Sequence, residues 1–288
     1  MKLGLILSRI RKDERRLIAA AQARGFDVTT IDNTSVHFDL EKPDLEMDVL
    51  IDRCVDHHRG VYALKIAEDW GILTLNAYDV VEVYGNRLLA EMALREHGVV
   101  TPQVRVAFTP ESALEAMEEV GYPVVLKPVE GPSGQLISRI QDKFTAQTVL
   151  EHKKILGTYH HSIFFIQKYI EAPGHDIRAF VVGDRTVAAI SVLTNHWITP
   201  IEDGGLMNTY PVSDELNDIA VQAVEAVGGG VLAVDLVRTS DQWQVIDLSQ
   251  PTGLAEAEEV TGINIAEHII EYAVSYVKTG AKREDTPS

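Results

Sequence analysis

Cysteine is almost absent from this chain, since Cys54 is the only one in 288 residues. A single cysteine excludes an internal disulfide framework and is typical of a reducing compartment, so we expect the protein in the cytoplasm. Cys54 lies beside an expected strand end, where the role of a small buried hydrophobic residue is favoured over that of a nucleophile.

Long hydrophobic runs are also lacking. The longest, such as Val231–Val234, are much shorter than the roughly 20 apolar residues of a membrane-spanning helix. Met1–Ser8 contains no hydrophobic region followed by a cleavage site, so we interpret it as a first strand and not as a signal peptide.

Basic residues are scarce. The chain has 26 Lys and Arg against 43 Asp and Glu, which gives a formal net charge of −17. Such a surface repels nucleic acids and anionic lipids, so we expect neither a nucleic-acid nor a membrane partner. The rest of the composition is that of an ordinary globular protein, and the length suits one to three compact units.

Several standard site motifs are missing. The chain has no Walker A sequence, Gly228–Gly230 lacks the G-x-G-x-x-G spacing, and no nucleophile elbow of a serine hydrolase occurs. The histidine pairs at 57–58 and 160–161 lack four-ligand zinc spacing, and neighbouring histidines on a strand point to opposite faces. Exposed histidines are therefore favoured over a zinc site.

The periodic segments predict three lobes of α/β or α+β type, with a parallel sheet in the first. We place the boundaries at 1–84, 85–170 and 171–280, followed by a frayed polar tail at 281–288. In the first lobe and just after it, the expected strands are Lys2–Ser8, Phe26–Ile31, Asp48–Ile51 and Ile72–Asn76, and the expected helices are Asp13–Arg24, Gly60–Trp70 and Arg87–Glu96.

In the second lobe, Thr109 and Pro110 predict the start of a helix that runs to Val120, because they suit the N-cap and the first helical position. The other expected elements of the second and third lobes are the hairpin strands Val124–Lys127 and Leu136–Ile140, the helix Phe144–Leu156, the strands Ile163–Ile170, Ile177–Val182, Val187–Val192, Leu232–Val237 and Gln244–Leu248, and the helices Glu215–Val227 and Ile265–Val277.

One candidate phosphate site follows an apolar strand. Lys127 ends that strand, and the small-residue turn Gly131–Gly134 comes shortly after it. An ammonium group and free backbone N–H groups of this kind can surround a polyphosphate. The alternative is an ordinary hairpin whose lysine extends to water.

A second candidate region spans Gln167 to Arg178. Its first strand and linker could hold adenine through backbone groups, with Glu171 near a ribose. Asp176 and Arg178 lie on one face of the next strand, where an arginine can stabilise charge on a transferring phosphoryl group. A surface ion pair is the plainer interpretation of Asp-x-Arg alone.

A third candidate site consists of aspartates within apolar strands. Asp235 and Asp247 are costly to bury unless they are paired or bound to a metal. Two such strands side by side would bring both carboxylates together as a site for Mg²⁺. The alternative is that one of them lies at a strand end and faces water.

Taken in this order, the segments resemble the ATP-grasp superfamily, in particular the branch that contains RimK and the lysine-biosynthesis ligase LysX. The resemblance extends from Lys2 to about Val277. It depends on several stretches together: Arg53-Cys54-Val55, Arg59-Gly60, residues 121–129, residues 150–153, Asp176-Ile177-Arg178, His196-Trp197-Ile198-Thr199, and residues 226–231.

The resemblance implies a three-lobed ATP-grasp fold with an N-terminal pre-ATP-grasp domain, and a carbon–nitrogen ligase that uses ATP and Mg²⁺. Such enzymes phosphorylate a carboxylate, and an amine then attacks the acyl phosphate. LysX-like enzymes join an amino acid to the C-terminal glutamate of a small acidic carrier protein, LysW. We therefore expect a small amino acid or amine and a peptide or carrier protein as substrates, in amino-acid biosynthesis, and a homo-oligomer.

The resemblance also implies roles for individual residues. Arg178 would be the catalytic residue at the transferring phosphoryl group, and the remaining positions divide into three groups. The nucleotide-binding group is Arg87, Lys127, Gly131, Ser133, Gly134, Gln167, Tyr169, Ile170, Glu171 and Asp176; the metal group is Asp235, Asp247 and Ser249; the acceptor group is His196, Gly253 and Glu256.

The sequence departs from the family at several of these positions. Arg87 stands where a lysine is usual, and Gln135 stands where the loop commonly ends in an arginine. The second metal strand usually has Asn-Glu-x-Asn, whereas here Asp247 and Ser249 provide a shorter carboxylate and a hydroxyl. The acceptor loops gain acids at 202–203 and in 256–259.

These changes allow two hypotheses. In the first, the protein is an active ligase with a less acidic or cationic substrate, because Lys127, Arg178, Asp235 and Asp247 all remain. In the second, it is a paralogue that binds ATP, has lost turnover and has a regulatory role.

Overall fold

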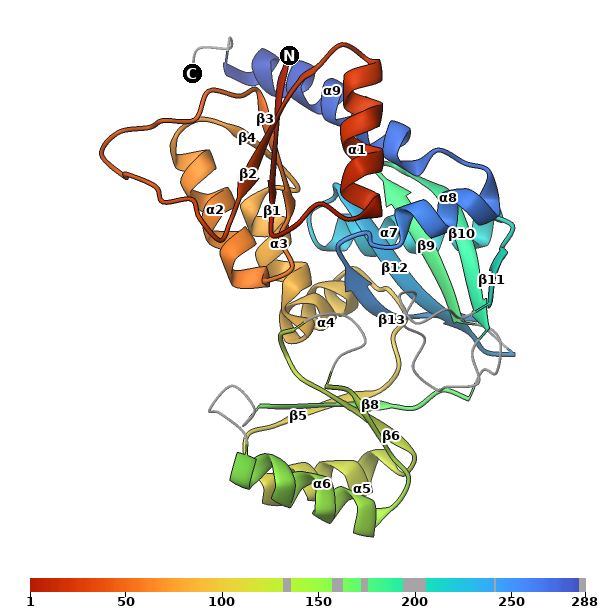
Figure 1. Ribbon diagram of the computed structural model, residues 1–288. Helices are drawn as coiled ribbons and strands as arrows, with labels where there is room; N and C mark the ends of the chain where they lie inside the picture. Colours follow the sequence, from red (N-terminus) through yellow and green to blue (C-terminus); the bar gives the residue numbers. More distant parts are fainter. Residues whose placement is uncertain (132–135, 157–162, 172–175, 194–205, 241, 285–288) are drawn as a thin grey trace.

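The computed structural model describes residues 1–131, 136–156, 163–171, 176–193, 206–240 and 242–284, which form three sheets with helices packed on them (Figure 1). The first is parallel, in the order β2-β1-β3-β4, which confirms the expected α/β region. Its elements and the two helices that follow are β1 (Lys2–Leu7), α1 (Lys12–Ala23), β2 (Asp27–Asp32), β3 (Val49–Arg53), α2 (His57–Asp69), β4 (Leu73–Leu75), α3 (Tyr78–Gly85) and α4 (Arg87–Glu96).

The central lobe has an antiparallel sheet in the order β5-β8-β6-β7, with α5 and α6 lying together on one side of it (Figure 1). Thr109 is the N-cap of α5, as expected, and its side chain accepts a hydrogen bond from the backbone N–H of Ser112. The elements are β5 (Val104–Ala107), α5 (Pro110–Val120), β6 (Val124–Lys127), β7 (Ser138–Ile140), α6 (Lys143–Leu156) and β8 (Phe164–Lys168).

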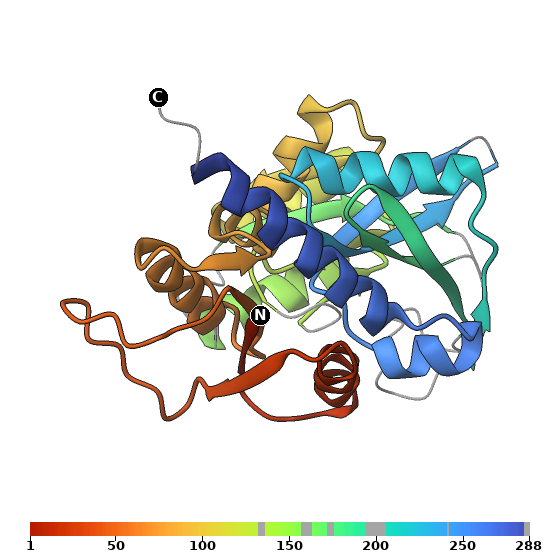
Figure 2. The same ribbon diagram turned by 90° about the horizontal axis from the view of Figure 1, so that it is seen from above.

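The C-terminal lobe is built on a larger antiparallel sheet in the order β11-β10-β9-β12-β13. Figure 2 shows α9, in dark blue, crossing the molecule diagonally, and this helix packs on α1 of the N-terminal region. The elements are β9 (Asp176–Val182), β10 (Arg185–Leu193), β11 (Leu206–Thr209), α7 (Asp214–Ala226), β12 (Val231–Arg238), β13 (Trp243–Ser249), α8 (Leu254–Thr261) and α9 (Ile265–Glu284).

The apolar cores do not follow the three sheets one by one. A single cluster joins Leu50 and Leu64 of the N-terminal region to Val224 and Leu232 of the C-terminal lobe, and a second cluster also contains residues of both. The central lobe has a separate core around Met117. The first and last parts of the chain therefore pack as one body, on which the central lobe is placed.

The structure differs from the sequence expectations in several elements. Helix α2 begins at His57 and not at Gly60, because the side chain of Asp56 accepts a hydrogen bond from the backbone N–H of Arg59 as an N-cap. His57 and His58 thus lie in a first helical turn and not on a strand. The expectation that these two histidines point to opposite faces of a strand was therefore wrong. Helix α9 continues to Glu284, four residues into the expected tail 281–288. The elements α3, β5, β11 and α8 are not predicted by the pattern.

None of the described helices combines the length and the apolar composition needed to cross a membrane.

Candidate functional site

Strand β13 is the place where the three parts of the chain meet. It is an edge strand of the C-terminal sheet, and in its pairing with β12 Asp247 is opposite Asp235, as expected. The register shifts next to this pair, so that Ile246 is an extra residue without a cross-strand partner. Its carbonyl oxygen accepts a hydrogen bond from Lys127 Nζ at 2.8 Å and a long one from Gln167 Nε2 at 3.5 Å. The bulge therefore turns a backbone acceptor of β13 toward two side chains of the central lobe.

Arg178 and Asp235 form a two-pronged ion pair on neighbouring strands. Arg178 Nε donates to Asp235 Oδ1 at 2.7 Å, and Nη2 donates to Oδ2 at 2.8 Å. The two residues are register partners of β9 and β12, which places their side chains on the same face of the sheet. Burial by itself lowers the pKa of Arg178, but the charge of Asp235, its hydrogen bonds and the charge of Asp247 together outweigh burial, so the pKa lies above its usual value.

Arg87 links the start of α4 to the opposite carboxylate. Its Nη2 donates to Asp247 Oδ2 at 3.4 Å, and its Nη1 donates to the Pro128 carbonyl at 2.9 Å. Burial raises the pKa of Asp247, but the charges of Arg87 and Lys127 more than offset this, so the pKa lies below its ordinary value. Asp247 is therefore an ionised carboxylate in a largely buried place.

The third cation of the junction is Lys127, which is buried at the end of β6. Loss of water around its ammonium group lowers its pKa, although Asp247 acts in the opposite direction. Within the described part of the chain, this junction brings three cations, Arg87, Lys127 and Arg178, to two aspartates. Arginine and lysine side chains gathered in this way suit a polyanion such as a triphosphate.

Two buried polar atoms at the junction have no hydrogen-bond partner among the described residues. They are Ser249 Oγ, two positions beyond Asp247 on the same strand, and Arg87 Nε. Because residues two apart on a strand share a face, Ser249 and Asp247 offer oxygen atoms in the same direction. Carboxylate and hydroxyl oxygens are ligands that suit Mg²⁺, so the donor set fits the expected metal. Each carboxylate, however, is already paired with an arginine.

One residue of the junction was not predicted from the sequence. Glu91 lies one helical turn after Arg87 on α4, is buried, and accepts a hydrogen bond from Thr101 Oγ1 at 2.7 Å. Burial raises its pKa, and the charges of Arg95 and Lys127 act against the increase. The spacing of Arg87 and Glu91 could have revealed it, since residues four apart share a helix face.

The other expected nucleotide-binding residues lie along the central lobe and the start of β9. Tyr169 follows β8; its N–H donates to the Pro123 carbonyl, and its hydroxyl accepts from Arg139 Nη1 at 3.3 Å. Asp176 is on the same face of β9 as Arg178. Ile170 is half-buried, Glu171 is exposed, and Gly131 has a φ of 133°, which favours glycine. Three further predictions, Ser133, Gly134 and His196, lie outside the described residues, as does Gln135.

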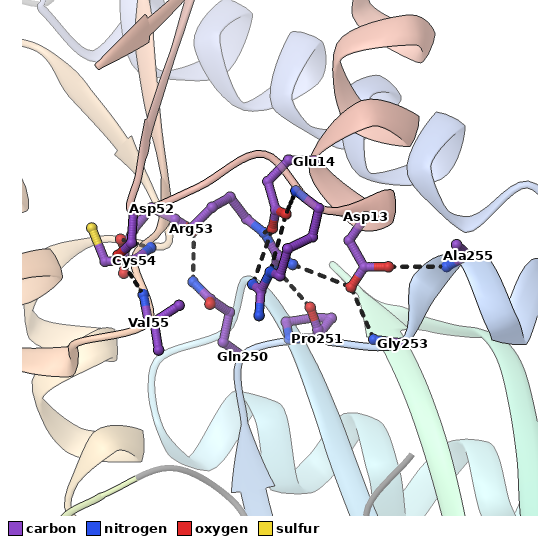
Figure 3. Close-up of polar contacts among 12 residues, drawn as sticks. Asp13, Glu14, Asp52, Arg53, Cys54, Val55, Gln250, Pro251, Gly253 and Ala255 are labelled. Carbon is purple, nitrogen blue, oxygen red and sulfur yellow. Dashed lines mark hydrogen bonds and ion pairs between the residues drawn. The ribbon is translucent and has the colours of Figure 1, made fainter. Parts of the chain in front are cut away.

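The expected acceptor residues Gly253 and Glu256 contact α1, and Figure 3 shows the contact between Gly253 and Asp13. Gly253 has a φ of 74° at the N-cap of α8, and its N–H donates to Asp13 Oδ2 at 2.9 Å. Lys12 Nζ donates to Glu256 Oε1 at 3.1 Å. Their role toward an acceptor stays a prediction, but their polar groups already have partners within the chain.

The acids that follow the metal strand are partly neutralised. Glu256 pairs with Lys12, and Glu258 pairs with Arg16 at 3.4 Å while also accepting a hydrogen bond from the Ala266 N–H. The segment is thus less anionic than its sequence indicates. The other acidic insertion, at 202–203, lies outside the described residues.

The histidines at 57–58 differ in their surroundings. His58 Nε2 is 3.3 Å from Glu130 Oε2, while burial lowers the pKa of half-buried His57. No cluster of three or more His, Cys, Asp or Glu side chains suited to a metal occurs in the part of the chain that the structure describes. His160 and His161 lie outside it. Cys54 is buried, as expected, and burial raises the pKa of its thiol.

Comparisons with known proteins agree with this architecture. A model of the RimK-like ATP-grasp domain matches residues 85–273, and a model of the LysX preATP-grasp domain matches residues 3–83. Similar proteins include the α-aminoadipate–LysW ligase LysX of Sulfurisphaera tokodaii, 29% identical over 96% of this chain and 100% of the relative, and a probable α-L-glutamate ligase of Pseudoalteromonas translucida, 31% identical over 94% and 95%.

A solved structure shows the same fold. The RimK domain ATP-grasp protein of Sphaerobacter thermophilus superposes with a TM-score of 0.81 at 22% identity, covering 94% of this chain and 99% of that protein. The two family models together cover nearly the whole chain, and the N-terminal sheet is parallel, as expected. The chain therefore belongs to the RimK-like ATP-grasp family and carries a LysX-type pre-ATP-grasp domain at its N-terminus.

Proposed function

We propose that this protein is an ATP-dependent carboxylate–amine ligase that works through an acyl phosphate. The observation that supports this most directly is the charged junction at β13, where Arg87, Lys127 and Arg178 converge on Asp235 and Asp247. Phosphoryl transfer needs cations arranged around a polyphosphate, with little other chemistry from the protein. The relatives named above are ligases by their names, which agrees with this assignment.

In this proposal the three cations hold the phosphates of ATP. Lys127 and Arg87 bind the phosphate chain, and Arg178 stabilises the γ-phosphoryl group as it moves to the substrate carboxylate. Gln167, Tyr169 and Ile170 contact the adenine, and Glu171 contacts the ribose. The amine of the second substrate then attacks the acyl phosphate and phosphate leaves.

Asp235, Asp247 and Ser249 would hold Mg²⁺. When bound, this ion neutralises charge on the phosphate oxygens. Since both carboxylates are now paired with arginines, we propose an exchange of partners: the guanidinium groups move to the phosphates and release the carboxylates. Asp235 and Asp247 lie opposite each other on β12 and β13, which supports a metal site that both carboxylates share.

For the substrates we propose a small amino acid or amine and the carboxylate of a peptide or carrier protein, in amino-acid biosynthesis. This rests on the similarity to proteins named as LysW and glutamate ligases. We also expect a homo-oligomeric enzyme of the cytoplasm. Sedimentation of the purified protein tests the oligomeric state.

The decisive experiment is to incubate the protein with ATP, Mg²⁺ and pairs of candidate acids and amines while measuring ADP and phosphate. Glutamate and α-aminoadipate with a LysW-type carrier form the first set, and peptides with C-terminal carboxylates form the second. Release of ADP that needs both substrates supports the proposal. Nucleotide binding without turnover for any pair would favour the alternative, a catalytically impaired regulatory paralogue.

A pair of substitutions separates these two functions further. Asp247→Glu with Ser249→Asn restores two of the three side chains usual for the family at the second metal strand, and Ile246 stays in place of the first asparagine. If the wild-type protein is inactive and this variant releases ADP, the metal strand is the cause of the loss. An inactive variant that binds nucleotide normally would instead place the cause elsewhere.

A further inference from the structure

The segment that leaves β13 is fixed to the N-terminal domain by four hydrogen bonds (Figure 3). Gln250 Nε2 donates to the Asp52 carbonyl at 2.6 Å, and Arg53 Nη1 donates to the Pro251 carbonyl at 2.7 Å. Asp13 then accepts from two backbone N–H groups, that of Gly253 at 2.9 Å and that of Ala255 at 3.1 Å. All four bonds lie within a few residues of Ser249 and Asp247.

The groups that make these bonds are held in place themselves. Arg53 is 3% exposed, and its guanidinium also contacts Glu14 Oε1 at 3.1 Å and Asp13 Oδ2 at 3.4 Å. Glu14 is completely buried and accepts in addition from the backbone N–H of Arg11. A buried arginine between two carboxylates has little freedom to change its rotamer, because any movement leaves an unpaired charge.

The position of these contacts distinguishes them from ordinary packing between domains. β13 is an edge strand, so only β12 holds it through a ladder of backbone hydrogen bonds. Its opposite side is held by Val100 O, which accepts from Val245 N, and by Lys127 at the bulge. Without the contacts after Ser249, the C-terminal end of the strand would be fixed on one side alone.

We propose that Asp13, Arg53 and Gln250 are positioning residues that hold the C-terminal end of β13, and with it Asp247 and Ser249, in the place required to bind Mg²⁺ with nucleotide. This inference rests on the proposed function, because it concerns the same metal strand. The three residues touch neither nucleotide nor metal. They act through the backbone of residues 250–255, as outer groups do when they orient the ligands of a metal.

The test measures binding and not turnover. The fluorescent analogue N-methylanthraniloyl-ATP is titrated at a series of Mg²⁺ concentrations into wild-type protein and two variants, Asp13→Asn and Gln250→Leu. Asparagine keeps the size of Asp13 but can accept only through one oxygen, so one of the two N–H groups loses its partner. Outer groups of metal sites are typically worth about tenfold or more in metal affinity, so we expect both variants to need roughly tenfold more Mg²⁺ for half-maximal binding.

A matched control uses another contact between the same two parts of the chain. Arg24, at the end of α1 opposite Asp13, donates to Glu267 of α9 at 2.9 Å, outside the segment 250–255. Arg24→Gln should leave the Mg²⁺ requirement unchanged. Amide hydrogen exchange of peptides covering 244–256 gives a second measurement, and it should be faster in Asp13→Asn than in Arg24→Gln.

The outcomes separate this inference from the proposed function. If the wild-type protein binds the analogue in a Mg²⁺-dependent manner and both variants match it, the positioning role is rejected while the proposed function stands. A control variant that shifts as much as Asp13→Asn also rejects it, because domain association in general would then be responsible. A wild-type protein that binds no analogue at any Mg²⁺ concentration refutes the proposed function, and the positioning role with it. Gln250→Leu removes no charge, so it serves as the test if Asp13→Asn does not fold.

Discussion

Removing Arg178 and removing Asp235 should have unequal effects on stability, although the two residues form one ion pair. The nitrogens and oxygens are 2.7 and 2.8 Å apart, and the side chains are 10% and 19% exposed. At an effective dielectric constant of about 20, charges at this distance attract by ~6 kcal/mol. Desolvation of both ions cancels most of that gain, yet an ion left alone in a buried place costs about 3–5 kcal/mol.

The inequality follows from the third residue, Asp247. Arg178→Met leaves Asp235 facing Asp247 across two strands, and like charges in such positions repel. Asp235→Asn leaves Arg178 with Asp247 as a remaining counter-ion, since this carboxylate already helps to raise the pKa of the arginine. We expect Arg178→Met to lower the free energy of unfolding by about 3–5 kcal/mol, and Asp235→Asn by about 2 kcal/mol.

Urea unfolding of both single variants and of the double variant, followed by circular dichroism, measures these differences. The double variant should be more stable than Arg178→Met alone, because it lacks the pair of facing carboxylates. Equal losses in the two single variants would refute the reasoning. So would a double variant that is less stable than Arg178→Met.

Three further outcomes are expected. Mg²⁺ alone should raise the melting temperature much less than Mg²⁺ with ATP. The reason is that Asp235 and Asp247 stay paired with arginines until the phosphates of ATP bind those arginines instead. An equal increase would show that the carboxylates are free. Burial raises the pKa of Asp52, so the folded state holds its proton more tightly and wild-type stability falls as pH rises from the unfolded value toward the folded one. Asp52→Asn should make stability, measured by urea unfolding from pH 4 to 8, less dependent on pH in that window, and an unchanged profile contradicts this. Cys54 should react with a maleimide at less than about a tenth of the rate of an exposed thiol until the protein unfolds, since it is buried and its thiol pKa is raised; rapid labelling of native protein contradicts its placement.

Local signals explain which parts of the fold could be predicted from the sequence. Thr109 and Pro110 define a helix start within a few residues, and the apolar residues on both sides of Asp235 and Asp247 predict two strands that would bring the carboxylates together. The four-residue strand β5 was missed, whereas β6, of the same length, was predicted because its residues Val124–Leu126 form a continuous apolar run.

The remaining features of the site depend on contacts between distant parts of the chain. The bulge at Ile246 depends on how β12 and β13 align, and nothing in either strand alone specifies it. The arginine partners of both aspartates, and the contact between Asp13 and the start of α8, join residues that are far apart in the sequence. The sequence indicates the residue types but not these pairings.

The shared core has a consequence for how this chain can be divided. The two family models meet between residues 83 and 85, so by sequence similarity the first segment is a domain separate from the rest. The packing does not follow this boundary, because Leu50 and Leu64 share one hydrophobic core with Val224 and Leu232 from the C-terminal lobe. A fragment cut at the module boundary would expose those side chains to water and should aggregate, whereas an excision of the central lobe removes a unit with its own core. The boundary between the two family domains and the boundary of the cooperatively folding unit therefore fall at different places in this protein.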